Sequence, residues 1–320
     1  MKVGKCTNSD CIAPINCHEG EEDYKTCQYW IANNSKEVKR KEKVTSRINN
    51  SNVSWSGDPF KVEDVAKIHA RGVPIYIGIV GKADAGKTTF LAMLYTLLLR
   101  GGQFDGYKFA GTKTILGWEE LYHKLKVFKN QVSFPDPTPF EYYRLLHYAL
   151  KDENGLLRDI LLSDASGEVF SLWAQNRNDA SAENARKIYS TSSAFVLFID
   201  CVDLIDRMNI AKTEIVDIAQ MLISDLRERP VIVVWSKAER KKEVNHIIRE
   251  SLKEEMNDLF KNYIEIDISN FSEDDPDCKV HVNNLKVIDL VLSEVDKINK
   301  GAIVSVKNDY EDLFLNYKGK

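Results

Sequence analysis

The sequence predicts an α/β fold with a doubly wound, mostly parallel sheet, and two observations support it. An apolar run at 75–80 leads into a glycine-rich loop and then into a helical stretch at 89–100. Strand-like runs and helical stretches then alternate along the chain, which is typical of parallel strands joined by crossover helices. We expect the strands at 75–80, 107–114, 156–163, 194–200, 231–236 and 263–269. We expect the helices at 89–100, 118–129, 139–150, 180–190, 209–229, 243–261 and 285–300, with a short one at 64–70.

Residues 81–88 fit the phosphate-binding pattern G-x-x-x-x-G-K-[ST] at every fixed position. Backbone N–H groups of such a loop and of the following helix point at a β-phosphate, where the helix dipole favours negative charge. Lys87 adds positive charge toward the β- and γ-phosphates, and the Thr88 hydroxyl is placed to bind Mg²⁺. The alternative, a glycine turn before an ordinary helix, is disfavoured by the flanking segments. The expected nucleotide contacts here are Gly81, Asp84, Ala85, Gly86, Lys87, Thr88 and Thr89.

The third strand ends in a D-x-x-G arrangement formed by Asp164 and Gly167. An acid at the tip of a buried strand can hold Mg²⁺, directly or through water, and a glycine lets its N–H approach a γ-phosphate closely. The segment that follows would then order with a triphosphate and relax after hydrolysis. Glu168 follows directly as a candidate for orienting the attacking water, although a structural role fits it equally well.

The fifth strand runs into Ser236-Lys237-Ala238-Glu239, a variant of the guanine-reading pattern N-K-x-D. A carboxylate at Glu239 can accept hydrogen bonds from guanine N1 and N2, and the stem of Lys237 can pack on the base. The pattern favours GTP, and ATP stays the alternative because Ser and Glu replace Asn and Asp. Ser269-Asn270, after the sixth strand, can add backbone contacts to the base edge.

Hydrolysis further requires a switch threonine that closes over Mg²⁺ and the γ-phosphate. Thr112 and Thr114 are the candidates between residues 101 and 156, and an ordinary role as β-branched strand residues is their alternative. Thr112 and Lys87 join Glu168 as the candidate catalytic residues. Arg144, Arg177, Arg186 or a partner's residue can supply an arginine finger.

Four of the six cysteines lie in the first 27 residues, at Cys6, Cys11, Cys17 and Cys27. Tetrahedral Zn²⁺ takes four thiolates, and a segment this short cannot build its own apolar core. We therefore expect a small zinc module at 1–30; disulfides and unligated thiols are the alternatives, and His18 can replace one cysteine.

Composition and charge set the remaining expectations. The chain has 320 residues and a net charge of −4, so nothing in its overall charge favours nucleic acid or an anionic membrane. The sequence shows neither a signal peptide nor a membrane-spanning run, which predicts a cytoplasmic protein. A polar, basic linker is expected at 31–72, the nucleotide-binding domain at 73–300 and a short tail at 301–320. The basic linker is either a solvated segment or a docking site for an acidic partner or nucleic acid.

Three blocks of the sequence carry a family resemblance: Phe109–Glu119, Asp159–Phe170 and Ala194–Asp200. They resemble the second type of double-GTPase domain, a TRAFAC-class GTPase of bacterial conflict and defence systems. The resemblance covers about residues 73–300. It implies phosphate contact at Gly86, Lys87 and Thr88, metal and γ-phosphate sensing at Asp164 and Gly167, and a role as a sensor beside other proteins.

The sequence therefore predicts a Mg²⁺-dependent GTPase switch joined to a zinc module. Two alternatives remain: an adaptor whose nucleotide site only supports the fold, and an ATPase that remodels a protein or nucleic-acid partner.

Overall fold

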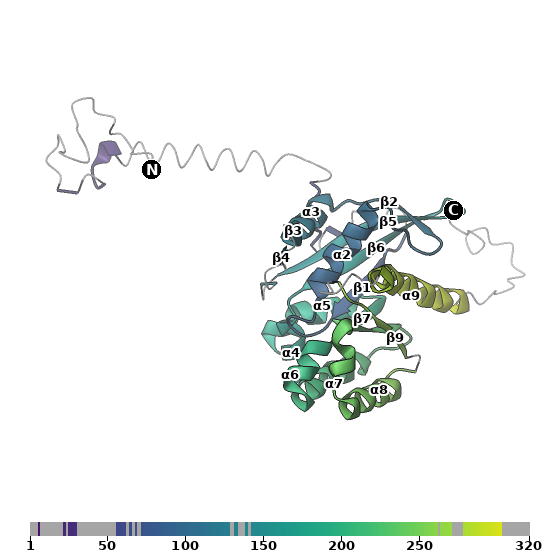
Figure 1. Ribbon diagram of the computed structural model, residues 1–320. Helices are drawn as coiled ribbons and strands as arrows, with labels where there is room; N and C mark the ends of the chain where they lie inside the picture. Colours follow the sequence, from purple (N-terminus) through teal and green to yellow (C-terminus); the bar gives the residue numbers. More distant parts are fainter. Residues whose placement is uncertain are drawn as a thin grey trace, which may run out of the picture. The chain divides into compact units, whose positions relative to one another are not determined.

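The computed structural model describes residues 6, 22–23, 25–30, 56–61, 64–65, 68, 72–128, 131–133, 138–139, 142–261, 263–270 and 278–302. The chain divides into two compact units, Met1–Ser56 and Gly57–Lys320. In the first unit, residues 28–30 are helical and Cys27 is buried. All the strands and helices discussed below belong to the second unit (Figure 1).

The second unit is built on a seven-stranded sheet in the order β2-β5-β6-β1-β7-β8-β9. Four neighbouring pairs are parallel: β6-β1, β1-β7, β7-β8 and β8-β9. The two pairs at the other side of the sheet, β2-β5 and β5-β6, are antiparallel. The prediction of a mostly parallel sheet is therefore confirmed. The strand bounds are β1 Ile75–Val80, β2 Tyr107–Gly111, β5 Tyr143–Asp152, β6 Leu157–Ala165, β7 Ala194–Asp200, β8 Val231–Ser236 and β9 Ile264–Asp267. A separate two-stranded sheet pairs β3 Lys126–Phe128 with β4 Gln131–Ser133.

Helices cover both faces of the large sheet (Figure 1). One face packs against α2 (Lys87–Leu99), α3 (Ile115–Lys124) and α9 (Cys278–Ala302). The other packs against α4 (Glu168–Gln175), α5 (Glu183–Thr191), α6 (Cys201–Arg207), α7 (Asn209–Ile223) and α8 (His246–Leu259). Two short 3₁₀ helices lie at Ala180–Ala182 (η3) and Ala238–Glu243 (η4). Since each face has its own apolar core, the sheet is doubly wound as predicted.

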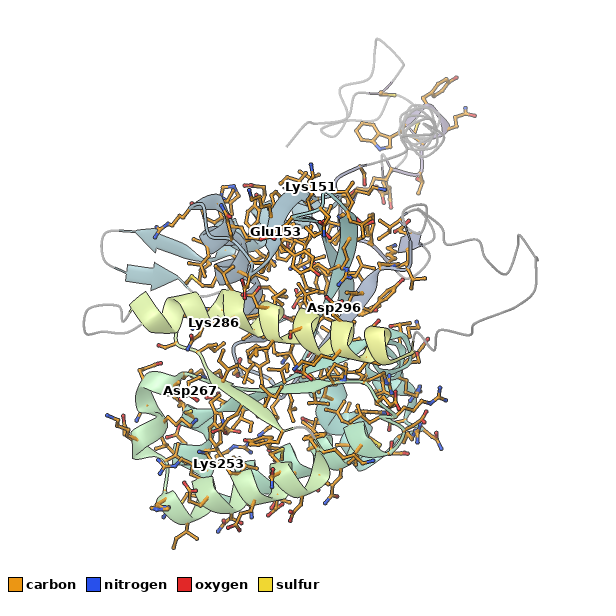
Figure 2. All side chains as sticks on the ribbon, turned by 90° about the vertical axis from the view of Figure 1, so that its right-hand side faces the viewer. Lys151, Glu153, Lys253, Asp267, Lys286 and Asp296 are labelled. Atoms are coloured by element: carbon orange, nitrogen blue, oxygen red, sulfur yellow. The ribbon has the colours of Figure 1, made fainter. Side chains whose placement is uncertain are left out.

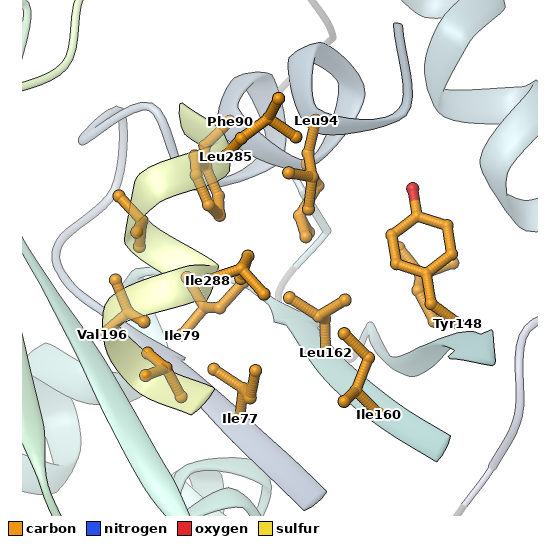
Figure 3. Close-up of a cluster of buried hydrophobic side chains, with 14 of the residues drawn as sticks. Ile77, Ile79, Phe90, Leu94, Tyr148, Ile160, Leu162, Val196, Leu285 and Ile288 are labelled. Atoms are coloured by element: carbon orange, nitrogen blue, oxygen red, sulfur yellow. The ribbon is translucent and has the colours of Figure 1, made fainter. Parts of the chain in front are cut away.

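The central strand β1 is held by side chains from both neighbouring helices. Ile77 and Ile79 point from β1 into the first core, where they meet Phe90 on α2 and Ile288 on α9 (Figure 3). All four are at most 1% exposed. Each such side chain contributes roughly 1.5–3 kcal/mol by leaving water, so this core fixes the end of β1 and the start of α2. The phosphate-binding loop lies between those two points.

The prediction of a helix at 139–150 is wrong, because residues 143–152 form strand β5. Its residues from Arg144 to Leu150 are buried without interruption, since the strand is covered on both faces. A run that is apolar on both faces carries no period that separates a buried strand from a helix. The antiparallel pairing with β6, which aligns Arg144 with Asp164, is what makes this segment a strand and not a helix.

Smaller differences concern where the elements end. The helix expected at 118–129 is α3, which begins at Ile115 and ends at Lys124 before strand β3. The helix expected at 209–229 ends at Ile223, and α6 precedes it. The strand expected at 107–114 ends at Gly111.

Residues 57–72, which the sequence assigns to the linker, fall in the second unit. Phe60 pairs with Leu145 of β5 through two backbone hydrogen bonds of 2.9 Å. Together with Val65 and Ile68 it forms a small apolar cluster on β5 and β6. Of the short helix expected at 64–70, the structure describes a 3₁₀ turn at 64–65 and a turn at Ile68.

Helix α9 also makes polar contacts with the edge of the sheet. Asp296, which is labelled in Figure 2, lies on this helix. It accepts a hydrogen bond from the Tyr107 hydroxyl at 3.1 Å and pairs with Arg158 at 2.5 Å. These contacts join the last helix to β2 and β6. In the described part of the chain, no helix is both long and apolar enough to span a membrane.

Candidate nucleotide-binding site

The glycine-rich loop connects the end of β1 to the start of α2, at the centre of the sheet. Asp84 and Gly86 both adopt positive φ, 59° and 82°, so the chain turns sharply before the helix begins at Lys87. Backbone turned in this way presents successive N–H groups to one side and forms an anion-binding concavity. Because α2 starts there, its dipole adds to the attraction for a phosphate.

Lys87 lies inside this loop. Its Nζ donates to the carbonyl oxygens of Gly81 at 3.0 Å and Lys82 at 2.6 Å, and the residue is only 6% exposed. Burial lowers the pKa of the Lys87 ammonium to about 8, although the nearby carboxylates of Asp164 and Asp84 act in the opposite direction. An anionic ligand in the loop would restore the charge that burial disfavours.

Three side-chain oxygens meet at the start of α2. The Thr88 hydroxyl donates to Asp164 Oδ1 at 3.1 Å and lies 3.0 Å from the Thr138 hydroxyl. Two hydroxyls and a carboxylate beside a phosphate loop form a set of hard oxygen donors that suits Mg²⁺. Thr138 belongs to none of the sequence motifs. The only local signal for it is its position between Pro137 and Pro139, just before β5.

A second carboxylate contact comes from the strand that was expected to be a helix. Arg144 Nε donates to Asp164 Oδ2 at 2.9 Å, and its Nη1 donates to Glu120 Oε2 at 3.0 Å. The guanidinium also lies over the Tyr142 ring, 4.7 Å from its centroid. Arg144 therefore links α3 to Asp164, the acid at the tip of β6.

Gly167 packs directly against the phosphate loop. A Cβ atom built on it would lie 2.0 Å from the backbone N of Ala83 and 2.3 Å from the carbonyl oxygen of Lys82. No side chain fits there without moving the loop, so the close approach requires glycine. Glu168 begins α4 immediately after it, and its side chain is exposed.

Lys82 fixes the outer part of the loop to two helices. Its Nζ pairs with Asp203 of α6 at 2.8 Å and with Glu214 of α7. Arg207 bonds the same two carboxylates. Burial raises the pKa of Asp203, and the nearby Glu214 carboxylate raises it further. Four charged groups thus hold the loop against α6 and α7.

The variant base-reading motif lies where β8 ends. Ser236 is buried, donates to the Ile199 carbonyl at 3.2 Å, and its Cβ lies 3.9 Å from the position a Cβ would take on Gly86. Lys237 Nζ pairs with Asp200 at 2.7 Å, and Glu239 is exposed at the start of η4. The end of β8 therefore brings Ser236 beside the phosphate loop, and Asp200 at the end of β7, which no sequence motif singles out, positions Lys237.

Two buried polar atoms near this motif lack partners. Ser269 Oγ and Asn270 Oδ1 have no hydrogen-bond partner among the described residues. The segment that carries them is tied to the motif, because the Ala238 N–H donates to the Ile268 carbonyl at 3.1 Å. Buried polar atoms are normally paired, so two orphans here fit a place where a ligand supplies the missing partners.

Thr112 lies elsewhere in the hydrogen-bond network. Its hydroxyl donates to the His147 carbonyl at 2.5 Å, and the Thr114 hydroxyl accepts from the His147 N–H at 2.9 Å. The His147 ring accepts from the Lys113 N–H and contacts Asp159 at 2.9 Å. These contacts attach the 112–114 segment to β5. Among the arginine-finger candidates, Arg144 contacts Asp164, whereas Arg177 and Arg186 line a different cavity.

Of the expected zinc ligands, Cys6 is half-buried and Cys27 is buried. Cys11 and Cys17 lie outside the described residues. Within the part of the chain that is described, no three His, Cys, Asp or Glu side chains are grouped as metal ligands.

A buried lysine in a glycine-rich loop, an acid at the tip of the neighbouring strand and a glycine packed on that loop define a P-loop GTPase fold and site. The family model of Double-GTPase 2 matches residues 75–293, and the chain belongs to this family. A search of curated proteins found no match.

Two solved structures are also similar to this chain. One is a nucleolar GTP-binding protein 1 from Plasmodium falciparum, with 12% identity and a TM-score of 0.40, over 72% of this chain and 91% of that one. The other is Methanosarcina barkeri Roco2 RocCORdC bound to GDP, with 14% identity and a TM-score of 0.38. It matches over 69% of this chain and 49% of its own length. At these scores neither likeness supports a conclusion about function.

Proposed function

We propose that this protein is a GTP-binding switch that hydrolyses GTP with Mg²⁺. The observation that carries the proposal is the meeting of Thr88, Asp164 and Thr138 oxygens beside the buried Lys87. Membership of a GTPase family supports the choice of reaction. Phosphoryl transfer needs positioning and charge stabilisation more than covalent chemistry, and these residues supply both.

Each residue has a definite task in this proposal. The loop backbone and Lys87 hold the β- and γ-phosphates, and Thr88, Asp164 and Thr138 would hold Mg²⁺. Bound Mg²⁺ neutralises charge that develops on the phosphate oxygens. The Gly167 N–H would contact the γ-phosphate, and the exposed Glu168 carboxylate, at the first position of α4, would orient the attacking water.

Base recognition is assigned to the ends of β8 and β9. The Lys237 stem, held by Asp200, would lie on the base, and Glu239 would accept from the guanine edge. The unpaired Asn270 Oδ1 is an additional acceptor. Because adenine presents an acceptor at N1 where guanine presents a donor, acceptors at this edge favour GTP over ATP.

A steady-state phosphate-release assay tests the hydrolysis. The parent protein should release phosphate from GTP in the presence of Mg²⁺, and Lys87→Ala should abolish measurable turnover. Lys297→Ala is a suitable control, since Lys297 is exposed on α9 and pairs only with Glu294 among the described residues. Turnover of Lys87→Ala at the parent rate would show the mechanism to be wrong.

Competition binding tests the base. We expect GTP and GDP to displace a bound fluorescent guanine nucleotide at much lower concentration than ATP, and Asn270→Ala to narrow that difference. If ATP competes better than GTP in the parent protein, the result favours the alternative of an ATPase that remodels a partner. Nucleotide binding without phosphate release in any condition would instead favour the adaptor.

Zinc binding by Cys6, Cys11, Cys17 and Cys27, a role in bacterial defence and an effector protein as partner remain parts of the proposal. Metal analysis of protein purified without added metal tests the first. We expect about one zinc per chain, lost when Cys6 and Cys11 are both replaced by Ser. A folded chain free of zinc would contradict it.

A further inference from the structure

A cavity of about 680 Å³ lies at the opposite ends of the strands from the nucleotide site. Its lining includes Ser192, just before β7 begins at Ala194, and Arg229, just before β8 begins at Val231. It therefore lies at the amino ends of these parallel strands. The phosphate loop follows the carboxyl end of the parallel strand β1, and the base-reading motif follows that of β8, so the two sites are separate.

The lining of this cavity is predominantly basic. Five of the lining residues are Arg or Lys, and two are acidic. Lys187 pairs with Glu183 at 2.7 Å, and Arg227 pairs with Asp225 at 3.3 Å. Three guanidinium groups, those of Arg177, Arg186 and Arg229, then remain without a carboxylate partner among the described residues. Three uncompensated positive charges around one cavity attract an anion.

Backbone carbonyls hold two of these guanidinium groups in place. Arg186 Nη1 donates to the carbonyls of Arg177 and Asp179 at 2.9 and 2.5 Å. Arg229 donates to four carbonyls, including that of Tyr189 at 2.5 Å and that of Asp225 at 2.7 Å. Carbonyl partners fix the planar groups without cancelling their charge. The positive charge is therefore preorganised, which lowers the cost of binding a ligand.

Trp173, which belongs to the same lining, carries a buried donor without an acceptor among the described residues. Trp173 on α4 is 1% exposed, and its Nε1–H has no hydrogen-bond partner in the described part of the chain. Its ring packs at 5.1 Å from the Tyr189 ring, which is also part of the lining. Buried N–H groups are rarely left unpaired, and this one belongs to a residue of the cavity wall.

We propose that this cavity is a second ligand site, which binds a small phosphorylated molecule. Phosphate oxygens accept charge-assisted hydrogen bonds from arginine and carry more than one negative charge, which suits three guanidinium groups that no carboxylate neutralises among the described residues. The volume is in the range of small-molecule sites, about 300–1,000 Å³, and so exceeds what a single phosphate ion needs.

Calorimetric titration of the full chain with inorganic pyrophosphate tests this site. The Lys87→Ala background removes the main cation of the nucleotide site, and Mg²⁺ is omitted because pyrophosphate chelates it. We expect one saturable site in Lys87→Ala. Adding Arg177→Glu should weaken binding about tenfold or more, since it replaces a charge-assisted contact by repulsion. Arg177 is exposed, so this change should leave thermal unfolding unaltered.

The matched control is Arg249→Glu, which reverses an arginine charge on α8 that pairs with Glu250. It should leave pyrophosphate affinity within about twofold, because Arg249 is not part of the cavity lining and salt screens charges that lie further away. Equal weakening by Arg177→Glu and Arg249→Glu would reduce the effect to overall charge and overturn the proposal.

Three further outcomes would also overturn it. Binding that is lost in Lys87→Ala and unaffected by Arg177→Glu belongs to the phosphate loop. Heat that does not saturate by about 1 mM pyrophosphate means that no site is present. Saturable binding of a tetraglutamate peptide in place of pyrophosphate means that the cavity receives an acidic protein segment. None of these results depends on whether the protein hydrolyses GTP.

Discussion

Arg144 and Asp164 lie opposite each other on neighbouring antiparallel strands, and Arg144 Nε donates to Asp164 Oδ2 at 2.9 Å. The Asp164 side chain is fully buried and that of Arg144 is 5% exposed. The other carboxylate oxygen accepts from the Thr88 hydroxyl. Because one oxygen is held by the arginine, the other stays directed at the start of α2. The pair therefore positions the acid that the proposed Mg²⁺ site uses.

Removing the arginine should destabilise the protein. Arg144→Ala leaves a buried carboxylate without its cation, which costs about 3 kcal/mol or more in the free energy of unfolding. Arg144→Lys keeps the charge but cannot reach Asp164 and Glu120 together, so we expect a smaller loss. Urea unfolding measures both.

The comparison variant is Lys297→Ala, which breaks the Lys297–Glu294 pair of α9, where the lysine is 68% exposed. Exposed pairs contribute about 0–1 kcal/mol, so this variant should unfold almost as the parent does. If Arg144→Ala unfolds at the same urea concentration as Lys297→Ala, the buried pair does not support the fold.

The fold was predictable where the sequence carries local signals. The loop at 81–88 fixes the order strand, loop, helix, and the apolar runs of β7 and β8 were placed with the correct bounds. Strand β5 was not predictable, because His147, Tyr148 and their neighbours are buried on both faces and show no alternation. Only the pairing with β6, which is a long-range contact, distinguishes this strand from a helix.

The candidate site divides in the same way. Lys87, Thr88 and Asp164 lie in motifs of fixed spacing, and the structure brings them together. Thr138 reaches Thr88 from 50 residues away through a loop whose path no local pattern encodes. Thr112, the sequence candidate for that task, bonds the His147 carbonyl instead. Spacing along a chain identifies residues within one motif, but not a partner that the tertiary fold supplies.

The pKa of Lys87 predicts how nucleotide affinity depends on pH. Burial lowers this pKa from 10.5 to about 8 in the ligand-free protein, and bound phosphates favour the charged form. Above pH 8 the protein must therefore take up a proton to bind. GDP affinity should fall as pH rises through 8, roughly tenfold between about pH 7.5 and 9. Calorimetry in two buffers of different ionisation heat should show the proton uptake.

The lowered pKa of Lys87 also predicts how the stability of the protein changes with pH. Between pH 8 and 10.5 the unfolded chain keeps the Lys87 proton that the folded chain has lost, so stability of the ligand-free protein rises with pH in that window. Lys87→Met removes the titrating group. In this variant the rise in stability should be absent, and GDP affinity should change with pH only as far as GDP itself titrates. A parent and a Lys87→Met protein with parallel pH profiles would refute the assignment.

Thr138 and Thr112 should separate in a mutational comparison. Thr138→Ala removes a hydroxyl 3.0 Å from Thr88, so we expect the Mg²⁺ concentration for half-maximal GTP binding to rise about tenfold. Thr112→Ala loses its bond to the His147 carbonyl and should cost about 1 kcal/mol of stability without changing the Mg²⁺ requirement. Titration of Mg²⁺ at fixed GTP measures the first effect, and urea unfolding the second. The reverse pattern would return the switch role to Thr112.

Gly167 gives the most stringent test of how closely the D-x-x-G segment meets the phosphate loop. In Gly167→Ala the new methyl group would lie 2.0 Å from the Ala83 backbone nitrogen, so either the loop or the start of α4 must move. Because positioning errors of about 1 Å cost on the order of a hundredfold in rate, phosphate release should fall by at least that factor. Ser166→Ala is the neighbouring control, since the Ser166 hydroxyl makes only a 3.4 Å contact with the Glu168 N–H among the described residues. Parent-like turnover of Gly167→Ala would mean that this segment moves away from the loop before the reaction occurs.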